Sequence, residues 1–235
     1  GVGEALIEES FAILREHQLS RARCILKFLY NQPETARYHL RLYQKCGFVK
    51  ERPNSILLLT SISKTTTKPH AIKNLYTVDG ADLSLEEYAD FTQRAYVSTP
   101  EDKAVHQHDP YISNRKNVLN VLAAIKTGKL GFSPRECWQV ARLGNDIAGF
   151  IIGFMLKKTK YQPALGVIAE LGIFPEFRRK GIALSLIANI FQCFRRYECN
   201  YSLVGTPKAN KPALRLYSKA GYVPTFEQID FHKIL

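Results

Sequence analysis

One passage combines residue types that could hold a phosphorylated ligand. Residues 165–173 have the alternation of a strand, which ends at Pro175 and is followed by the basic turn 178–180 and then by a helix from Gly181. The first N–H groups of a helix have no partner within it, and its dipole places partial positive charge there. Such a turn is typical of phosphate sites. An ordinary strand-to-helix connection with exposed arginines is the alternative.

Two motifs in this region resemble those of the GCN5-related N-acetyltransferases (GNAT). The family's pattern [RQ]-x-x-G-x-[GA] is met by Arg178, Gly181 and Ala183. A second pattern, N-x-x-A-x-x-L-Y-x-K-x-G-[FY], is met between Asn210 and Tyr222. Both occur in the family's order, so the resemblance covers roughly residues 76–235.

This resemblance implies an α/β (α+β) fold with a mixed seven-stranded sheet flanked by helices. The sheet would be splayed between its fourth and fifth strands, where acetyl-CoA inserts as the cosubstrate. Backbone groups of Leu171 and Ile173 would bond the pantetheine arm, and the turn would hold the pyrophosphate. The cofactor-binding residues implied are Leu171, Gly172, Ile173, Arg178, Arg179, Lys180, Gly181, Ile182, Ala183, Asn210, Ala213 and Tyr217.

The implied activity is direct transfer of an acetyl group to an amine in a ternary complex. Glu170 would accept the ammonium proton, through a water, and a backbone N–H near Leu171 would stabilise the developing oxyanion. Tyr217 would protonate the departing thiolate, since a phenol remains protonated at neutral pH. The alternatives are a solvent-facing strand carboxylate for Glu170 and a helix residue packed on the sheet for Tyr217.

The polar stretch 97–109 and its surroundings supply weaker candidates. In the family this stretch lines the acceptor side, so Tyr96, His106, His108 and Tyr111 are candidate substrate contacts. His106 and His108 could also ligate a metal, but they have no partner cluster, and we expect no metal site. Trp138 lies on an expected strand and is interpreted as a core residue.

Hydrophobic periodicity places the elements around these residues. We expect helices at 4–16, 33–45, 84–96, 113–126, 181–197 and 211–219, and strands at 24–30, 54–62, 73–78, 138–143, 147–156, 165–173 and 201–205. Ser84 and Glu87 form a capping-box pattern. We expect 97–109 to be irregular and the chain to end in two strands, one near Tyr222 and one at 228–234.

The chain also contains an internal repeat. Residues 39–48 resemble residues 213–222, sharing Leu, Arg, Leu, Tyr, Lys and Gly in register. We therefore expect a partial, degenerate GNAT-like half domain at 1–64, a linker at 65–72 and a complete acetyltransferase domain at 73–235. Such an arrangement resembles a tandem acetyltransferase with an incomplete first copy. Its open sheet edge would be covered by the second domain or by a second copy in a homodimer.

Composition limits the remaining classes. The 235 residues carry a net charge of +12, yet the basic residues are dispersed and no nucleic-acid module is present, which disfavours nucleic-acid binding. No apolar run is long enough for a membrane helix. Gly1 in place of Met predicts a processed or cut chain, and five cysteines without a CxxC pattern indicate reduced thiols and a cytoplasmic location. A non-catalytic acyl-CoA-binding or interaction module is the alternative to an enzyme, and the amine acceptor is not identified.

Overall fold

The computed structural model describes residues 1–65, 71–107, 109–160 and 162–235. By their internal contacts these residues form two compact units. The first unit comprises Gly1–Leu57 together with Pro224–Leu235, and the second comprises Leu58–Val223. The linker expected at 65–72 lies mostly outside the described residues.

The first unit contains two helices beside a small antiparallel sheet. Its elements are α1 (Val2–Glu16), β1 (Arg21–Leu29), the short 3-10 helix η1 (Pro33–Ala36), α2 (Arg37–Lys45) and β2 (Val49–Lys50). The last strand, β9 (Val223–Ile234), pairs with β1 from Arg21↔Ile234 to Leu29↔Phe226 and also with β2. In the described part of the chain, β1 is an edge strand of the sheet.

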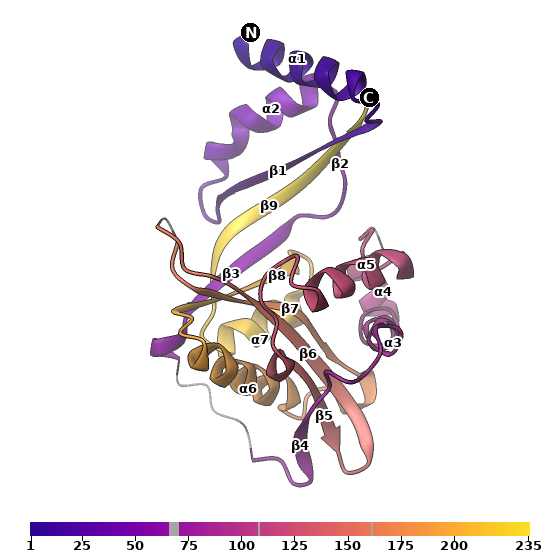
Figure 1. Ribbon diagram of the computed structural model, residues 1–235, viewed down its shortest axis with the longest axis vertical. Coiled ribbons are helices and arrows are strands. Elements are labelled where there is room, and N and C mark those ends of the chain that lie inside the picture. The colour runs from indigo at the N-terminus through magenta and orange to yellow at the C-terminus, as the bar shows by residue number, and fades with distance from the viewer. Residues whose placement is uncertain (66–70, 108, 161) are drawn as a thin grey trace. The chain divides into compact units, whose positions relative to one another are not determined.

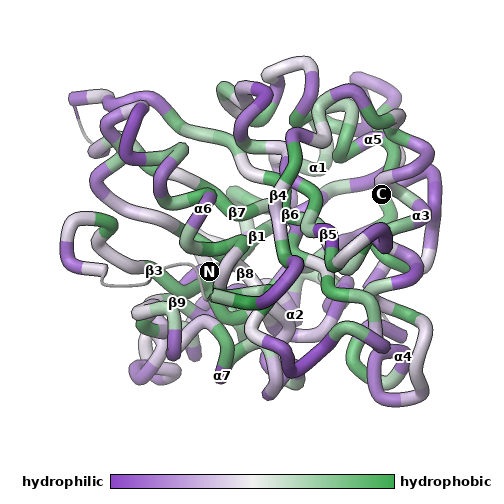
Figure 2. The backbone as a smooth tube through the Cα atoms, turned by 90° about the horizontal axis from the view of Figure 1, so that it is seen from below, coloured by the Kyte–Doolittle hydropathy of each residue, from purple (hydrophilic) through white to green (hydrophobic). Residues whose placement is uncertain are grey.

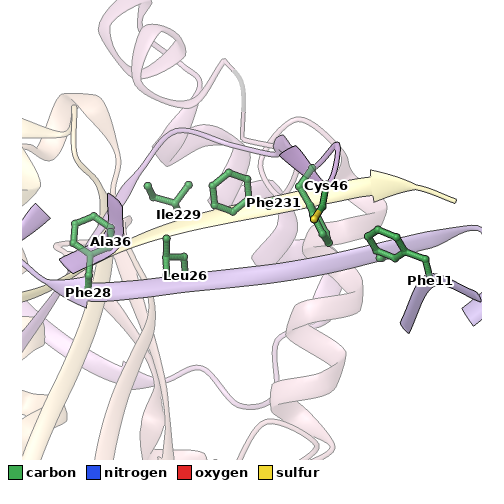
Figure 3. Close-up of a cluster of buried hydrophobic side chains, with 9 residues drawn as sticks. Phe11, Leu26, Phe28, Ala36, Cys46, Ile229 and Phe231 are labelled. Carbon is green, nitrogen blue, oxygen red and sulfur yellow. The ribbon is translucent and has the colours of Figure 1, made fainter. Parts of the chain in front are cut away.

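An apolar cluster holds this unit together (Figure 3). Alternate residues of β1 are buried, so one face of the strand carries the apolar side chains. Phe11 of α1 lies 5.6 Å from the ring of Phe48, which follows α2. The buried members are Phe11, Ala22, Leu26, Phe28, Ala36, Cys46, Phe48, Ile229 and Phe231.

The second unit is larger and is built around a mixed sheet. Its elements are the second half of β3 (Ser55–Ser61), η2 (Ile62–Lys64), β4 (Leu75–Asp79), α3 (Leu85–Tyr96), α4 (Pro100–His106), α5 (Arg115–Lys126), η3 (Arg135–Cys137), β5 (Trp138–Leu143), β6 (Asp146–Leu156), β7 (Leu165–Ile173), η4 (Pro175–Phe177), α6 (Ile182–Arg196), β8 (Tyr201–Pro207) and α7 (Lys211–Lys219). The strand order is β8-β7-β6-β5-β4, with β3 beyond β8.

Helices cover both faces of this sheet (Figure 1). A Cβ atom added to Gly172 would lie 2.7 Å from Ala95 of α3, whereas one added to Gly153 would lie 2.6 Å from Ile190 of α6. Most of the buried residues of β6 and α6 are apolar, and Figure 2 colours apolar residues green. The expected open α/β sheet flanked by helices is therefore confirmed.

The repeat in the sequence is matched by two helix ends of the same design. After α2, the N–H groups of Cys46, Gly47 and Phe48 bond to the carbonyls of Leu42, Gln44 and Tyr43. After α7, the N–H groups of Ala220, Gly221 and Tyr222 bond to the carbonyls of Leu216, Ser218 and Tyr217. Both glycines have positive φ, 76° and 88°, which a side chain would disfavour.

Two expectations about secondary structure were wrong. The stretch 97–109 is not irregular throughout, because α4 spans Pro100–His106. Thr99 caps this helix by accepting a bond from the Asp102 N–H, and Pro100 stands at its first position. The C-terminal residues form one strand, β9, rather than two. By contrast, the capping box of Ser84 and Glu87 is present as expected.

Candidate active site

A β-bulge in β7 decides which face of the sheet carries Glu170. On β6, Ile152 pairs with Glu170 and the next residue, Gly153, pairs with Ile168, so Ala169 has no partner there. Directly paired residues share a face and neighbours on a strand alternate. Glu170 therefore points to the face opposite Ile168 and shares the face of Gly172, on which α3 packs.

Beyond Ile168, β7 is no longer paired with β8. β7 and β8 are parallel and pair only from Leu165↔Tyr201 to Ile168↔Val204, although both strands continue. Residues 169–173 therefore have an open edge toward β8. Because β4 to β7 are the first four strands of the acetyltransferase domain expected at 73–235 and β8 is the fifth, the expected splay between the fourth and fifth strands is present.

Two tyrosines meet Glu170, whose side chain is only 4% exposed. The Tyr111 hydroxyl donates to Glu170 Oε1. The Tyr96 hydroxyl, from the end of α3, contacts the backbone of the next residue, Leu171, at 3.2 Å. Burial raises the pKa of Glu170 to about 7, against the opposing effect of the hydrogen bond from Tyr111 and of the nearby Tyr96 hydroxyl. A carboxylate with such a pKa can take up a proton at neutral pH.

Tyr217 of α7 lies close enough to Glu170 to be affected by its charge. Its ring lies 5.7 Å from that of Tyr222, and the side chain is buried. Burial, followed by the nearby charge of Glu170, raises the pKa of the Tyr217 hydroxyl. The phenol therefore stays protonated at neutral pH and is available as a proton donor.

The turn after β7 presents unpartnered N–H groups. Gly181 caps α6 with φ 85°, and Arg179 also has a positive φ of 65°. Among the described residues, no backbone hydrogen bond is made by the N–H groups from Arg179 to Leu184, and the first N–H of the helix that is bonded belongs to Ser185. The turn thus presents a row of free donors suited to a diphosphate.

Arg178 fixes this turn rather than reaching outward. Its guanidinium bonds both carboxylate oxygens of Asp102, at 3.1 and 2.9 Å. It also donates to the carbonyl of Ala95 at 2.8 Å and to that of Ile173 at 3.1 Å. This one side chain ties the end of β7 to α3 and α4. Arg178 thereby positions residues 178–183, which we call the phosphate turn after the ligand expected there.

Comparison with known proteins decides the family. Residues 90–222 match the model of the acetyltransferase (GNAT) family, which is more than half of the 235 residues. The chain belongs to the GNAT family. Within the matched range lie the open edge of β7, Glu170, Tyr217 and the phosphate turn.

Individual relatives of this GNAT chain are more distant. N-alpha-acetyltransferase 30 of Xenopus laevis is 31% identical over 90 residues, covering 38% of this chain and 32% of that protein, about a third of its length. A GCN5-related N-acetyltransferase from Sphaerobacter thermophilus has a TM-score of 0.63 at 17% identity, covering all of this chain and 68% of that one. A tandem GNAT protein from the clavulanic acid biosynthesis pathway has a TM-score of 0.64 at 15% identity, covering all of this chain and 70% of that one. The two structures show the shared fold.

The remaining expected GNAT cofactor residues surround the phosphate turn and α7. Leu171, Gly172 and Ile173 lie on the open part of β7, and Lys180 stands in the turn with its ammonium 5.3 Å from the Phe177 ring. The Asn210 side chain accepts a bond from the Ala213 N–H at 3.1 Å and thereby caps α7. The structure thus gives Asn210 a role in starting the helix that carries Tyr217.

The expected acceptor-side residues are only partly brought together. His106 stacks on Tyr96, with ring centroids 5.2 Å apart and planes 17° apart, and burial lowers its pKa. Its Nδ1 is buried without a hydrogen-bond partner. His108 lies outside the described residues. In the rest of the chain, no group of three or more His, Cys, Asp or Glu residues is arranged to hold a metal ion.

Two acidic residues of this site were missed in the sequence. Asp102 pairs with Arg178, and Asp109 accepts a bond from the Tyr111 N–H at 3.0 Å. The Thr-Pro-Glu-Asp sequence that starts α4 could have pointed to Asp102 as a residue of the first helical turn. No local signal relates Asp109 to Glu170.

None of the described helices is long and apolar enough to cross a membrane.

Proposed function

We propose that this GNAT chain is an N-acetyltransferase that moves an acetyl group from acetyl-CoA to an amine in a ternary complex. The observation that carries the proposal is the buried Glu170 at the point where β7 parts from β8. A thioester bound along this open edge would place its carbonyl group beside Glu170. An acceptor amine that attacks the carbonyl would therefore lie within reach of this base.

The residues present fit acetyl-CoA. The unpartnered N–H groups from Arg179 to Leu184 would take the pyrophosphate, as a helix start binds anions. The edge of residues 169–173 that is open toward β8 would bond the pantetheine arm. When bound, acetyl-CoA supplies the activated acetyl group, and the chain supplies the positions of the base and the acid.

Glu170 accepts the proton that the attacking ammonium must lose, and its pKa of about 7 suits that task. The Leu171 N–H faces the open edge and serves as donor to the negative charge that develops on the carbonyl oxygen. Tyr217 gives its proton to the leaving thiolate. No covalent bond to the chain is needed, so no acyl-enzyme should accumulate.

The acceptor belongs to the amines, as a small molecule or as a protein N-terminus or lysine. The partial match to N-alpha-acetyltransferase 30 places peptide N-termini first in an acceptor screen. We further propose that the first unit is an incomplete GNAT-like copy. The identical hydrogen-bond pattern after α2 and after α7 supports this proposal. A homodimer that covers the outer edge of β1 also belongs to this proposal.

The test uses the whole chain. Calorimetric titration with acetyl-CoA should show saturable binding, and free CoA should appear when acceptor amines are added. Glu170→Gln and Tyr217→Phe should each lower turnover by about a hundredfold or more while acetyl-CoA still binds. Tight binding without turnover of any amine would instead identify an acyl-CoA-binding module, and absence of binding would refute both.

A further inference from the structure

The loop before α5 is pinned around Tyr111. Three side chains, from the loop itself, α5 and α3, hold the backbone on both sides of this residue, and Ile112 beside it is buried. The bonds run from the Tyr111 N–H to Asp109 Oδ1 at 3.0 Å, from Asn117 Nδ2 to the Pro110 carbonyl at 2.8 Å, and from Gln93 Nε2 to the Ile112 carbonyl at 2.9 Å. A loop fixed in this way can deliver one side chain to a defined point.

That point is Glu170. The Tyr111 hydroxyl donates to Glu170 Oε1, and the two residues are 59 positions apart in the chain. A buried carboxylate loses its hydration, so its charged form depends on the donors that the protein provides. Tyr111 was expected to touch the acceptor, but its hydroxyl is already engaged with the expected base.

We infer that Tyr111 is a positioning residue: its hydroxyl holds the Glu170 carboxylate in one orientation and supplies the hydrogen bond that the charged form needs. The inference rests on the proposed function for its catalytic meaning, since it concerns the base of that reaction. The contact itself does not depend on which amine is acetylated.

The groups that face Glu170 come from several elements and act in opposite directions. Burial raises its pKa to about 7 and the charge of Asp109 adds to this, whereas the hydrogen bond from Tyr111 and the nearby Tyr96 hydroxyl lower it. Tyr217 of α7 faces it as a neutral phenol, because burial raises the pKa of Tyr217. Removing the Tyr111 hydroxyl should therefore move the protonation midpoint of Glu170 upward.

The experiment compares Tyr111→Phe with the wild-type chain. In the acetylation assay, the acid limb of the kcat/KM profile should move up by about one pH unit, so activity at pH 7 falls about fivefold and recovers at high pH. The KM for acetyl-CoA should not change. Tyr76→Phe is the matched control, because the Tyr76 hydroxyl on β4 bonds the Gly144 carbonyl far along the sheet.

A second readout does not need turnover. The carboxyl stretch of Glu170, identified in infrared difference spectra against Glu170→Gln, can be titrated in each variant. Its midpoint should rise in Tyr111→Phe and fall in Asp109→Asn, which removes a negative charge that raises the pKa of Glu170. Should Tyr111→Phe not fold, Asn117→Ala releases the Pro110 carbonyl and loosens the loop that carries Tyr111, so it should raise the midpoint in the same direction.

Equal midpoints in the wild type and in Tyr111→Phe would overturn the inference, as would a loss of activity that is the same at every pH. If no amine is acetylated by the wild type, the proposed function fails. The infrared midpoints would then still decide whether Tyr111 controls the protonation of Glu170.

Discussion

The hydroxyl of Tyr96 lies 3.2 Å from the backbone N and 3.2 Å from the backbone O of Leu171. It accepts from the one group and donates to the other, so it occupies the open edge of β7. These are the groups that the proposed function assigns to the pantetheine arm and to the oxyanion. Tyr96 must therefore release Leu171 when acetyl-CoA binds.

Tyr96→Phe should accordingly bind acetyl-CoA more tightly than the wild type. The substitution keeps the ring that stacks on His106 and removes only the competing hydroxyl. Since a hydrogen bond contributes about 1 kcal/mol net, we expect the Kd to fall about five- to tenfold, measured by calorimetry. Tyr76→Phe should leave it unchanged. Weaker binding in Tyr96→Phe would show that the hydroxyl assists the cosubstrate instead.

Arg178 and Asp102 should act as one unit in the phosphate turn. Arg178→Ala and Asp102→Ala should each weaken acetyl-CoA binding about tenfold, because the turn loses its tie to α4. A double-mutant cycle on thermal unfolding should give a coupling of about 1–3 kcal/mol. Arg135 and Asp82, an exposed pair on the same unit, provide the control, with coupling below about 1 kcal/mol. Additive effects at Arg178 and Asp102 would argue against a shared role.

Glu170 should make the chain less stable as the pH rises. Its pKa is about 7 in the folded chain against 4.5 as its ordinary value, so between these values the folded state binds more protons than the unfolded state. The free energy of unfolding therefore falls as pH rises through this window, by on the order of 3 kcal/mol. Glu170→Gln should lack this loss and should be more stable than the wild type at pH 8 but not at pH 4.

Urea denaturation at a series of pH values measures this dependence of the free energy of unfolding. Glu176→Gln is a suitable control variant. A backbone hydrogen bond within its own residue lowers the pKa of Glu176, so any effect has the opposite sign, and the side chain is exposed. A pH dependence of stability that is identical in the wild type and in Glu170→Gln would mean that the Glu170 carboxyl is not desolvated.

Phe11 should stabilise the first unit. Its ring is fully buried against Phe48, and the Lys233 ammonium lies 4.2 Å from the ring centroid. Phe11→Ala should cost about 3–5 kcal/mol through lost burial and the cavity left behind. Hydrogen exchange should then rise in α1, α2 and β1, while the exposed Leu6→Ala on the same helix should have little effect. Exchange that rises equally in β7 would contradict a separate core.

The sequence predicts best what depends on local spacing. The strand, turn and helix from Leu165 to Arg196 are recognisable because alternation, a basic turn and two small residues follow one another directly. The open sheet and its splay follow from the family resemblance that these residues carry. The helix α4 was missed because its seven residues are mostly polar, although Thr99 and Pro100 form a start signal.

The contacts of the site were harder to predict. Tyr111 was assigned to the acceptor side, but no pattern along the chain says that its hydroxyl reaches a carboxylate 59 residues away. Arg178 was assigned to the cofactor by its place in a motif, and only tertiary packing shows that Asp102 takes its guanidinium. Residue type and spacing identify which groups take part, whereas their partners depend on how loops pack.

The unpaired Ala169 decides on which face of the sheet Glu170 lies. Because Ala169 is an extra residue, Glu170 and Ile168 lie on opposite faces although they stand two positions apart. One residue inserted into β6 opposite Ala169 would restore regular alternation and turn the carboxylate toward α6, away from the tyrosines, with every side chain of the site still encoded. A single-codon insertion in β6 could therefore abolish activity without altering any motif of the site. Conversely, a chain in which the acid residue stands one place earlier or later could regain the same geometry by moving the bulge, so a comparison of such sites should count residues from the bulge instead of aligning carboxylates.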